Sequence, residues 1–256
     1  MIGDVLQVLV LLLILVVYFR YARRAEDNLY LVFAALSTAT LMISTIYYLT
    51  HSLLREGMRV PFAANDIADF GTFLMISTAL RSAVGTAKGR FRGVTVGAAA
   101  FAAANICLWI AWSGEWVRDI FGGLPFAYFI CVCIRSIYLT QAMSRWERCM
   151  MWALSISMVA VETAALLSPA GLQDTLETVD TVLLALGQAL LLTRVLLAFR
   201  AGKSADAVMS LCYTAFCWNA ISMYMTAGFA YTVFSNLMTL YALLMLLAAG
   251  KKVRAA

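Results

Sequence analysis

The chain has 256 residues, of which 63% are hydrophobic and only 13% are charged, and its formal net charge is +5. A soluble domain carries about 25% charged residues, so this composition is typical of a membrane protein. Apolar runs near the ~20 residues needed to cross a bilayer recur along the whole chain, and no segment between them is long enough to bury a core of its own. We therefore exclude a soluble catalytic or nucleic-acid-binding domain and expect one polytopic domain over 1–256 that contacts the lipid bilayer.

Hydropathy and turn signals predict an all-α integral membrane protein with about nine transmembrane helices. The predicted spans are 2–19, 29–50, 64–84, 93–113, 120–140, 149–168, 176–198, 206–226 and 229–249. The last two are separated because 205–250 is too long for one crossing and Ala227-Gly228 provides a tight turn. The three prolines, Pro61, Pro125 and Pro169, lie at or near span ends, so the helices should run largely unbroken.

The cationic residues predict the orientation of the spans. Thirteen of them follow odd-numbered spans: Arg20, Arg23, Arg24, Lys88, Arg90, Arg92, Arg145, Arg148, Arg200, Lys203, Lys251, Lys252 and Arg254. Only Arg55, Arg59 and Arg118 lie on the opposite side. Because cytoplasmic loops are enriched in Lys and Arg, this pattern places the N-terminus outside and the C-terminus in the cytoplasm, with an odd number of spans. We expect a multi-pass protein of the cell membrane, and take this to be the bacterial inner membrane.

The two halves of the chain share a spacing that suggests an internal duplication. The third, fourth and fifth spans recur about 112 positions later as the seventh, eighth and ninth, and an acidic pair opens both the third and the seventh. The hypothesis is a leading anchor helix over 1–27 and two parallel four-helix repeats over 28–142 and 143–256. The alternative is that any alternation of helices and loops of equal length produces such an offset, since residue identity between the halves is weak.

Glu162 is the strongest candidate for a functional residue. It is a lone carboxylate in the apolar stretch 149–167 and lies about 9 Å inside Ser168, too deep for a short side chain to reach water easily. An ionisable group at that depth is expensive and is by default a functional-site hypothesis. We expect it to be either protonated and hydrogen-bonded between helices, or ionised beside an arginine, a cation or a water-filled cavity.

The other charges near the membrane form two groups. Asp66, Asp69, Glu177 and Asp180 lie at outer helix starts, and Arg81, Arg135 and Arg194 lie at the inner ends of the third, fifth and seventh spans. A functional interpretation is an acidic outer vestibule that attracts cations or protons, above arginines that bind an anionic group. The competing interpretation is structural. Acids complement the positive end of a helix dipole, and arginines near a cytoplasmic end can snorkel to the headgroups.

Signatures of catalysis and of metal or cofactor binding are missing from the sequence. His51 is the only histidine, and the six cysteines form no Cys-x-x-Cys pair, so we interpret them as small buried apolar residues. We also find no nucleophile elbow, no phosphate-binding glycine loop and no lysine inside a span. We therefore expect neither an enzyme nor a bound cofactor or metal.

Two functional classes remain. The first is a small-solute transporter or permease whose ligand-binding residues include Glu162, Arg81, Arg135, Arg194, Asp66, Asp69 and Asp180. The second is a sensory or interaction module that binds a small molecule or ion and signals through a separate partner protein, because the short cytoplasmic loops hold no output domain. The chain could act as a homo-oligomer or with that partner, and we expect no nucleic-acid partner.

Overall fold

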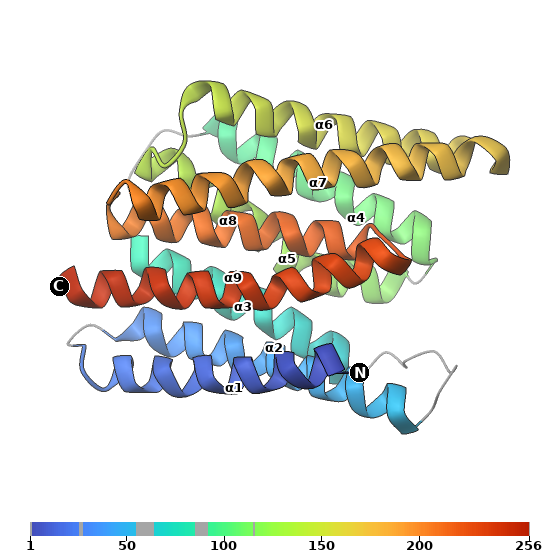
Figure 1. Cartoon of the computed structure of the whole chain (residues 1–256). Coiled ribbons are helices and arrows are strands. Elements are labelled where there is room, and N and C mark those ends of the chain that lie inside the picture. The colour runs from blue at the N-terminus through green and yellow to red at the C-terminus, as the bar shows by residue number, and fades with distance from the viewer. Residues whose placement is uncertain (1, 26–27, 55–63, 85–91, 115, 256) are drawn as a thin grey trace.

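The computed structural model describes residues 2–25, 28–54, 64–84, 92–114 and 116–255, and within these ranges all regular structure is helical. The helices are α1 (Ile2–Ala22), α2 (Leu29–Leu54), α3 (Ala64–Val84), α4 (Arg92–Ser113), α5 (Trp116–Thr140), α6 (Arg145–Leu167), α7 (Ala170–Arg200), α8 (Ala205–Tyr224) and α9 (Gly228–Ala255). They run back and forth as one bundle (Figure 1). This confirms the predicted all-α membrane fold, including the turn between the last two helices.

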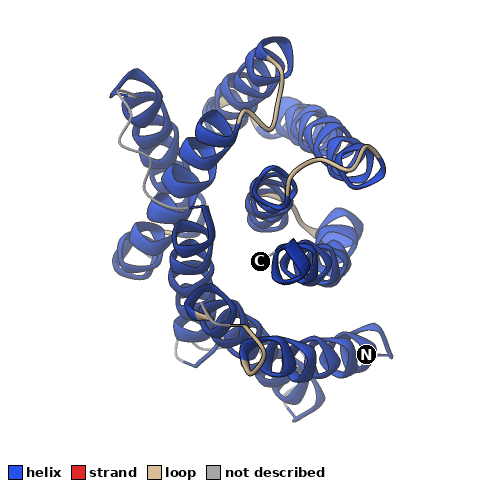
Figure 2. Ribbon diagram, turned by 90° about the vertical axis from the view of Figure 1, so that its left-hand side faces the viewer, coloured by secondary structure: helices blue, strands red, loops and turns tan. Residues whose placement is uncertain are grey.

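Eight of the helices in the described ranges are long and apolar enough to cross a membrane, and α8 is the exception. Polar residues such as Ser210, Asn219 and Ser222 lower its hydropathy, yet all three are fully buried. Viewed along the helix axes, α8 and α9 lie inside a curve formed by the other helices (Figure 2). Because protein rather than lipid surrounds α8, it can carry polar groups that a lipid-facing helix could not.

Local signals explain where several helices begin and end. Ser144 and Glu147 form a reciprocal capping box at the start of α6, with Ser144 N donating to Glu147 Oε2 at 2.8 Å. Gly228, at a φ of 58°, makes the turn into α9, a conformation that costs glycine little. Pro125 lies inside α5 without ending it, so the prediction of unbroken helices holds there.

The centre of the bundle depends on close approach between α7 and α8. A Cβ atom added at Gly187 of α7 would lie 2.5 Å from the indole of Trp218 on α8. The same indole donates from Nε1 to the carbonyl oxygen of Leu184 at 2.9 Å. Glycine at position 187 therefore lets the tryptophan ring lie flat against α7 and satisfy its buried N–H group.

Lys252 of α9 connects several helices at one end of the bundle. The charge pattern identifies this end as the cytoplasmic one. The Lys252 ammonium group lies 2.7 Å from Asp206 Oδ1 of α8, donates to the carbonyl oxygen of Ala83 on α3, and lies 5.8 Å from the centre of the Tyr30 ring on α2. We call this set of contacts the Lys252 clasp. One cation thus connects four helices, and it occupies the carbonyl end of α3, where a positive charge is favourable.

Some expectations fall outside the described structure or need correction. The cations Arg55, Arg59, Lys88 and Arg90 lie outside the described residues, and so do the side chains of Asp66, Arg92 and Arg118. All six cysteines are free, and Cys133, Cys212 and Cys217 are buried as predicted, whereas Cys107 and Cys149 are exposed on the surface of the bundle. That expectation was wrong for those two because hydrophobicity alone does not say whether a helix face meets protein or lipid.

The hypothesis of two repeats is not decided by the helix arrangement. The pairs α2–α3 and α4–α5 pack against each other in the first half, as α6–α7 and α8–α9 do in the second. Any chain of helical hairpins would show the same neighbours, so the duplication stays a prediction.

We predict that Gly187→Ala destabilises the bundle, because the added methyl group displaces Trp218 and breaks its hydrogen bond to Leu184. Overpacking of this kind costs about 1–3 kcal/mol, and ~1 kcal/mol corresponds to roughly 2–4 °C of unfolding temperature for a chain near this size. The matched control is Gly171→Ala, because nothing lies within 4 Å of a Cβ atom at that position. An unfolding temperature that is the same for Gly187→Ala and Gly171→Ala would contradict the packing described.

Candidate functional site

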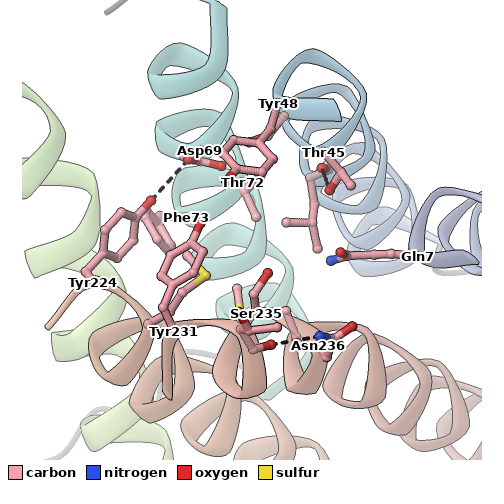
Figure 3. A pocket seen from close by; sticks show the side chains of 15 residues that line it. Gln7, Thr45, Tyr48, Asp69, Thr72, Phe73, Tyr224, Tyr231, Ser235 and Asn236 are labelled. Carbon is pink, nitrogen blue, oxygen red and sulfur yellow. Dashed lines mark hydrogen bonds between the residues drawn. The ribbon is translucent and has the colours of Figure 1, made fainter. Parts of the chain in front are cut away.

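A polar cavity of about 300 Å³ lies between α1, α2 and α3 on one side and α8 and α9 on the other. Its polar lining comes from the outer part of each helix (Figure 3). The labelled polar side chains are Gln7, Thr45, Tyr48, Asp69, Thr72, Tyr224, Tyr231, Ser235 and Asn236. Two sets of helices far apart in sequence, α1–α3 and α8–α9, thus place hydroxyl, amide and carboxyl groups around one space, where such groups can orient a bound ligand.

Asp69 supplies the cavity's charge. Among the described residues that line the cavity, it is the only acidic or basic side chain. Tyr224, the last residue of α8, donates from its hydroxyl group to Asp69 Oδ2 at 3.1 Å. The carboxyl group is half-buried, and this hydrogen bond between α8 and α3 holds it in position.

The packing of α2 against α3 positions Asp69. Thr40 and Thr72 contact each other through their hydroxyl oxygens at 2.9 Å, and Ser37 donates to the carbonyl oxygen of Thr72 at 3.2 Å. A Cβ atom at Gly71 would lie 3.3 Å from Thr40, so glycine lets the two backbones come close. Small residues and interhelical hydroxyl bonds are the usual means of tight packing inside membranes.

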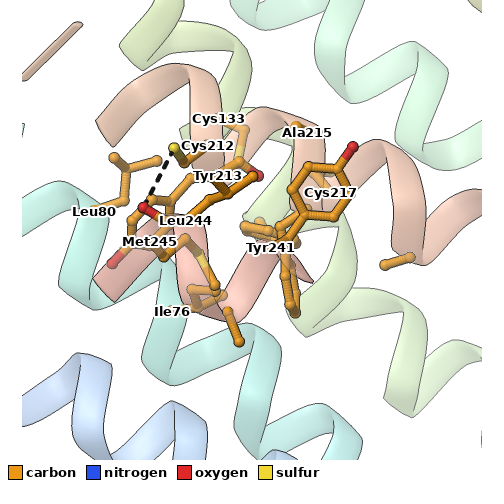
Figure 4. Close-up of a cluster of buried hydrophobic side chains, with 14 of the residues drawn as sticks. Ile76, Leu80, Cys133, Cys212, Tyr213, Ala215, Cys217, Tyr241, Leu244 and Met245 are labelled. Atoms are coloured by element: carbon orange, nitrogen blue, oxygen red, sulfur yellow. Dashed lines mark hydrogen bonds between the residues drawn. The ribbon is translucent and has the colours of Figure 1, made fainter. Parts of the chain in front are cut away.

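Below the cavity, toward the cytoplasmic end, the same face of α3 becomes apolar. Phe73, Ile76 and Leu80 follow Asp69 at helical spacing and are at most 3% exposed. Ile76 and Leu80 belong to a buried cluster that also contains Tyr241 and Met245 of α9 (Figure 4). The Lys252 clasp lies beyond this layer. The cavity is therefore separated from the cytoplasmic end by a packed apolar layer and then by an ion-paired one.

The structure places Glu162 and Asp180 elsewhere, at the contact between α6 and α7. Glu162 is 2% exposed and Asp180 is 1% exposed, and their carboxyl groups lie near each other. Within the described residues, neither oxygen of Asp180 makes a hydrogen bond of standard geometry. Glu177 lies near this pair and accepts a hydrogen bond from Gln173 at 3.0 Å. The described outer acids are thus divided between two places: Asp69 lies at the cavity, and Glu162, Glu177 and Asp180 lie between α6 and α7.

Glu162 lines neither the outer cavity nor the cavity that contains Arg81 and Arg135. Glu162 was expected either between helices or beside an arginine, a cation or a water-filled cavity. In the structure it lies between two helices, next to a second carboxyl group. We found no cationic partner for the pair in the described part of the chain. Two acidic groups buried together repel each other when ionised and lose their hydration, so this contact is a cost to stability.

The three arginines are also divided. Arg81 and Arg135 line a second cavity near the cytoplasmic end, and Arg81 donates to the hydroxyl group of Tyr128 at 3.3 Å. Arg194 instead lies 2.7 Å from Glu147 Oε1, the acid of the α6 capping box. Arg81 and Arg135 therefore share one cavity, while Arg194 joins the cytoplasmic ends of α6 and α7.

Sequence reasoning missed most of the cavity lining. Among its polar lining residues, only Asp69 was a predicted ligand-binding residue; Gln7, Ser44, Thr45, Tyr224, Tyr231 and Asn236 were not. A usable signal was present, because these polar residues all lie within about three turns of the outer ends of their helices. Only the packing of the five helices shows that these ends surround a common space.

No three His, Cys, Asp or Glu side chains of the described residues come together as metal ligands would. Comparison of the chain with protein-family models, curated proteins and solved structures finds no significant match. Function is therefore inferred from the geometry of the outer cavity, the arginine-lined cavity and the acidic pair.

We predict that Asp180→Asn raises the unfolding temperature, because an amide removes one of two repelling acids and can donate to the Glu162 carboxyl group. Relief of ~1 kcal/mol of this desolvation and repulsion corresponds to an increase of roughly 2–4 °C. Thermal unfolding in one detergent, with the exposed Asp174→Asn as the matched control, measures it. A clear decrease for Asp180→Asn alone would show that the carboxyl pair stabilises the fold.

Proposed function

We propose that the protein is a small-solute transporter whose substrate binds at Asp69 in the outer cavity. The observation that carries this proposal is a polar cavity with one carboxyl group, lying above a closed apolar layer. A transporter needs a site that is accessible from one side of the membrane while the path to the other side is blocked. The cavity, the packed layer and the Lys252 clasp provide this arrangement in sequence from the outer end to the inner end.

The cavity lining favours a small cationic solute with an amino or ammonium group. Asp69 offers a carboxyl group for a positive charge, and the rings of Tyr48, Phe73, Tyr224 and Tyr231 line the same space. Aromatic faces attract ammonium groups and are worth about 0.5–2 kcal/mol each. A water molecule takes ~30 Å³ of liquid volume, so a cavity of about 300 Å³ holds a solute of roughly ten non-hydrogen atoms.

The helices that form the cavity also suggest how it could open inward. Asp69 and Ala83 lie at opposite ends of α3, and Tyr224 and Asp206 lie at opposite ends of α8. The two helices are joined at the outer end by Tyr224–Asp69 and at the inner end through Lys252. A relative tilt of α3 and α8 that closed the outer contact around a substrate would act directly on the inner clasp.

We predict that small amines stabilise the wild-type protein and that Asp69→Asn removes this effect. Methylamine, tetramethylammonium and choline are suitable probes for a thermal-unfolding screen. A ligand at 100 times its Kd contributes about 2.7 kcal/mol, or roughly 5–10 °C for a chain near this size. The probe with the largest shift is then tested for uptake into proteoliposomes. We expect Asp69→Asn to take up less than about a tenth of the wild-type amount, since loss of a charged partner typically costs more than ~1.4 kcal/mol.

Asp174→Asn is the matched control, because it removes an exposed acid of α7 that does not line the cavity. It should keep both the stabilisation and the uptake. If no amine stabilises the wild type, or if Asp69→Asn behaves like the wild type, the cavity is not the substrate site. Stabilisation that depends on Asp69 without any uptake would instead support the sensory alternative.

A further inference from the structure

The second cavity, near the cytoplasmic end, has the opposite charge. It lies between α3, α4 and α5, has a volume of about 340 Å³, and is lined by Arg81, Arg135, Tyr128 and Ser136. None of its described lining residues is acidic. It shares no lining residue with the outer cavity, so it is a separate site that the proposed transport of a cation does not use.

The two arginines are not neutralised by the protein around them. In the described part of the chain, Arg81 makes one hydrogen bond, to the uncharged hydroxyl group of Tyr128, and neither Arg81 nor Arg135 has an ion pair. Two guanidinium groups in one cavity repel each other when no anion lies between them. The pair is therefore better suited to holding an anion than to stabilising the empty bundle.

The direction of Arg81 distinguishes this site from simple snorkelling. An arginine that snorkels extends toward the headgroups beyond its helix end. Arg81 lies three residues before the end of α3, yet its guanidinium contacts Tyr128, which lies twelve residues, or about 18 Å, before the end of α5. The side chain is thus retained along the wall of the cavity.

Ser136 provides a second, independent indication of a ligand. It is 4% exposed, lines the cavity one residue after Arg135, and its hydroxyl oxygen has no hydrogen-bond partner among the described residues. A buried hydroxyl group without a hydrogen-bond partner costs about 1–3 kcal/mol. An oxygen atom of a ligand in the cavity would accept a hydrogen bond from it. Ser136 and Tyr128 add neutral donors to the two cationic ones.

We infer that this cavity binds a phosphate group, held by Arg81 and Arg135 and by the hydroxyl groups of Tyr128 and Ser136. The planar fork of a guanidinium donates two parallel hydrogen bonds and matches phosphate oxygens. A cavity at the inner end of the bundle can receive that group from the headgroup of an anionic phospholipid or from a soluble phosphate ester. The recognition chemistry is the same for both sources.

The test measures thermal unfolding of the purified full-length chain in detergent with two sets of probes. The lipid arm adds phosphatidylglycerol, with phosphatidylcholine as the zwitterionic comparison, and the soluble arm adds glycerol 3-phosphate, with sodium chloride at equal ionic strength. We expect at least one phosphate-bearing probe to raise the unfolding temperature of the wild type. In the Arg81→Gln/Arg135→Gln double variant the probe concentration needed for half the shift should rise roughly tenfold or more.

The matched control is Arg145→Gln/Arg200→Gln, which removes the same charge from two exposed arginines outside the cavity and should keep the wild-type response. Ser136→Ala leaves both arginines in place and should weaken binding severalfold, so the test does not depend on the double variant folding. A response only to phosphatidylglycerol identifies a lipid headgroup, and a response to glycerol 3-phosphate identifies a soluble ester. No response to either probe, or an equal loss in the control pair, would overturn the inference.

Discussion

Helix α8 contacts α3, α5, α7 and α9, and these neighbours bury every residue from Ala207 to Ser222 except Thr214. A helix enclosed in this way does not have to be apolar all round, because its polar groups are shielded from lipid and can bond to neighbouring helices. Trp218 donates to α7, and Asn219 donates to the carbonyl oxygen of Phe234 on α9 at 2.8 Å. The outer cavity lies at one end of this enclosure, where the last residues of α8 face α3 and α9.

The charges of the bundle are arranged so that each end contacts a different kind of group. At the outer end, Tyr224 of α8 contacts the carboxyl group of Asp69, and aromatic rings line the space beside it. At the inner end, Asp206 of the same helix forms an ion pair with Lys252, while Arg81 of α3 and Arg135 of α5 line the second cavity. In the proposed transporter, α8 is the element that connects the substrate site to the closed inner layer. The phosphate site lies to one side of this path, where a lipid or a soluble ester could bind without entering it.

Much of the fold could be predicted from the sequence because bilayer thickness and backbone hydrogen bonding leave few alternatives for long apolar runs. The helix bounds and the turn before Gly228 were close to those observed. The hydropathy of α8 was the weakest signal, since its polar residues reflect burial by protein rather than exposure. Asp69, Arg81 and Arg135 were candidates because charge near a span end is visible in the sequence, and in the structure they line cavities; their role in binding stays a prediction.

The sequence does not show which neighbour the Glu162 side chain meets. Depth along a helix can be counted, but the neighbour that each helix face meets depends on packing between distant segments. Glu162 proved to lie near Asp180 rather than in the outer cavity, and Asp69 of α3 and Asp180 of α7 contact different parts of the bundle. The polar residues at five outer helix ends could not be grouped until the arrangement of those helices was known.

The central claim is that the Asp69 cavity is open to the outside and closed toward the cytoplasm. Labelling by a membrane-impermeant maleimide tests it most directly, with adducts counted by mass spectrometry against the parent chain in sealed vesicles of known orientation. Ser235→Cys, in the cavity lining, should react from the outer side only, and a small amine that binds should slow the reaction. Met245→Cys, in the apolar layer below, should react from neither side. Reaction of Ser235→Cys from the cytoplasmic side, or none from the outer side, would contradict the account.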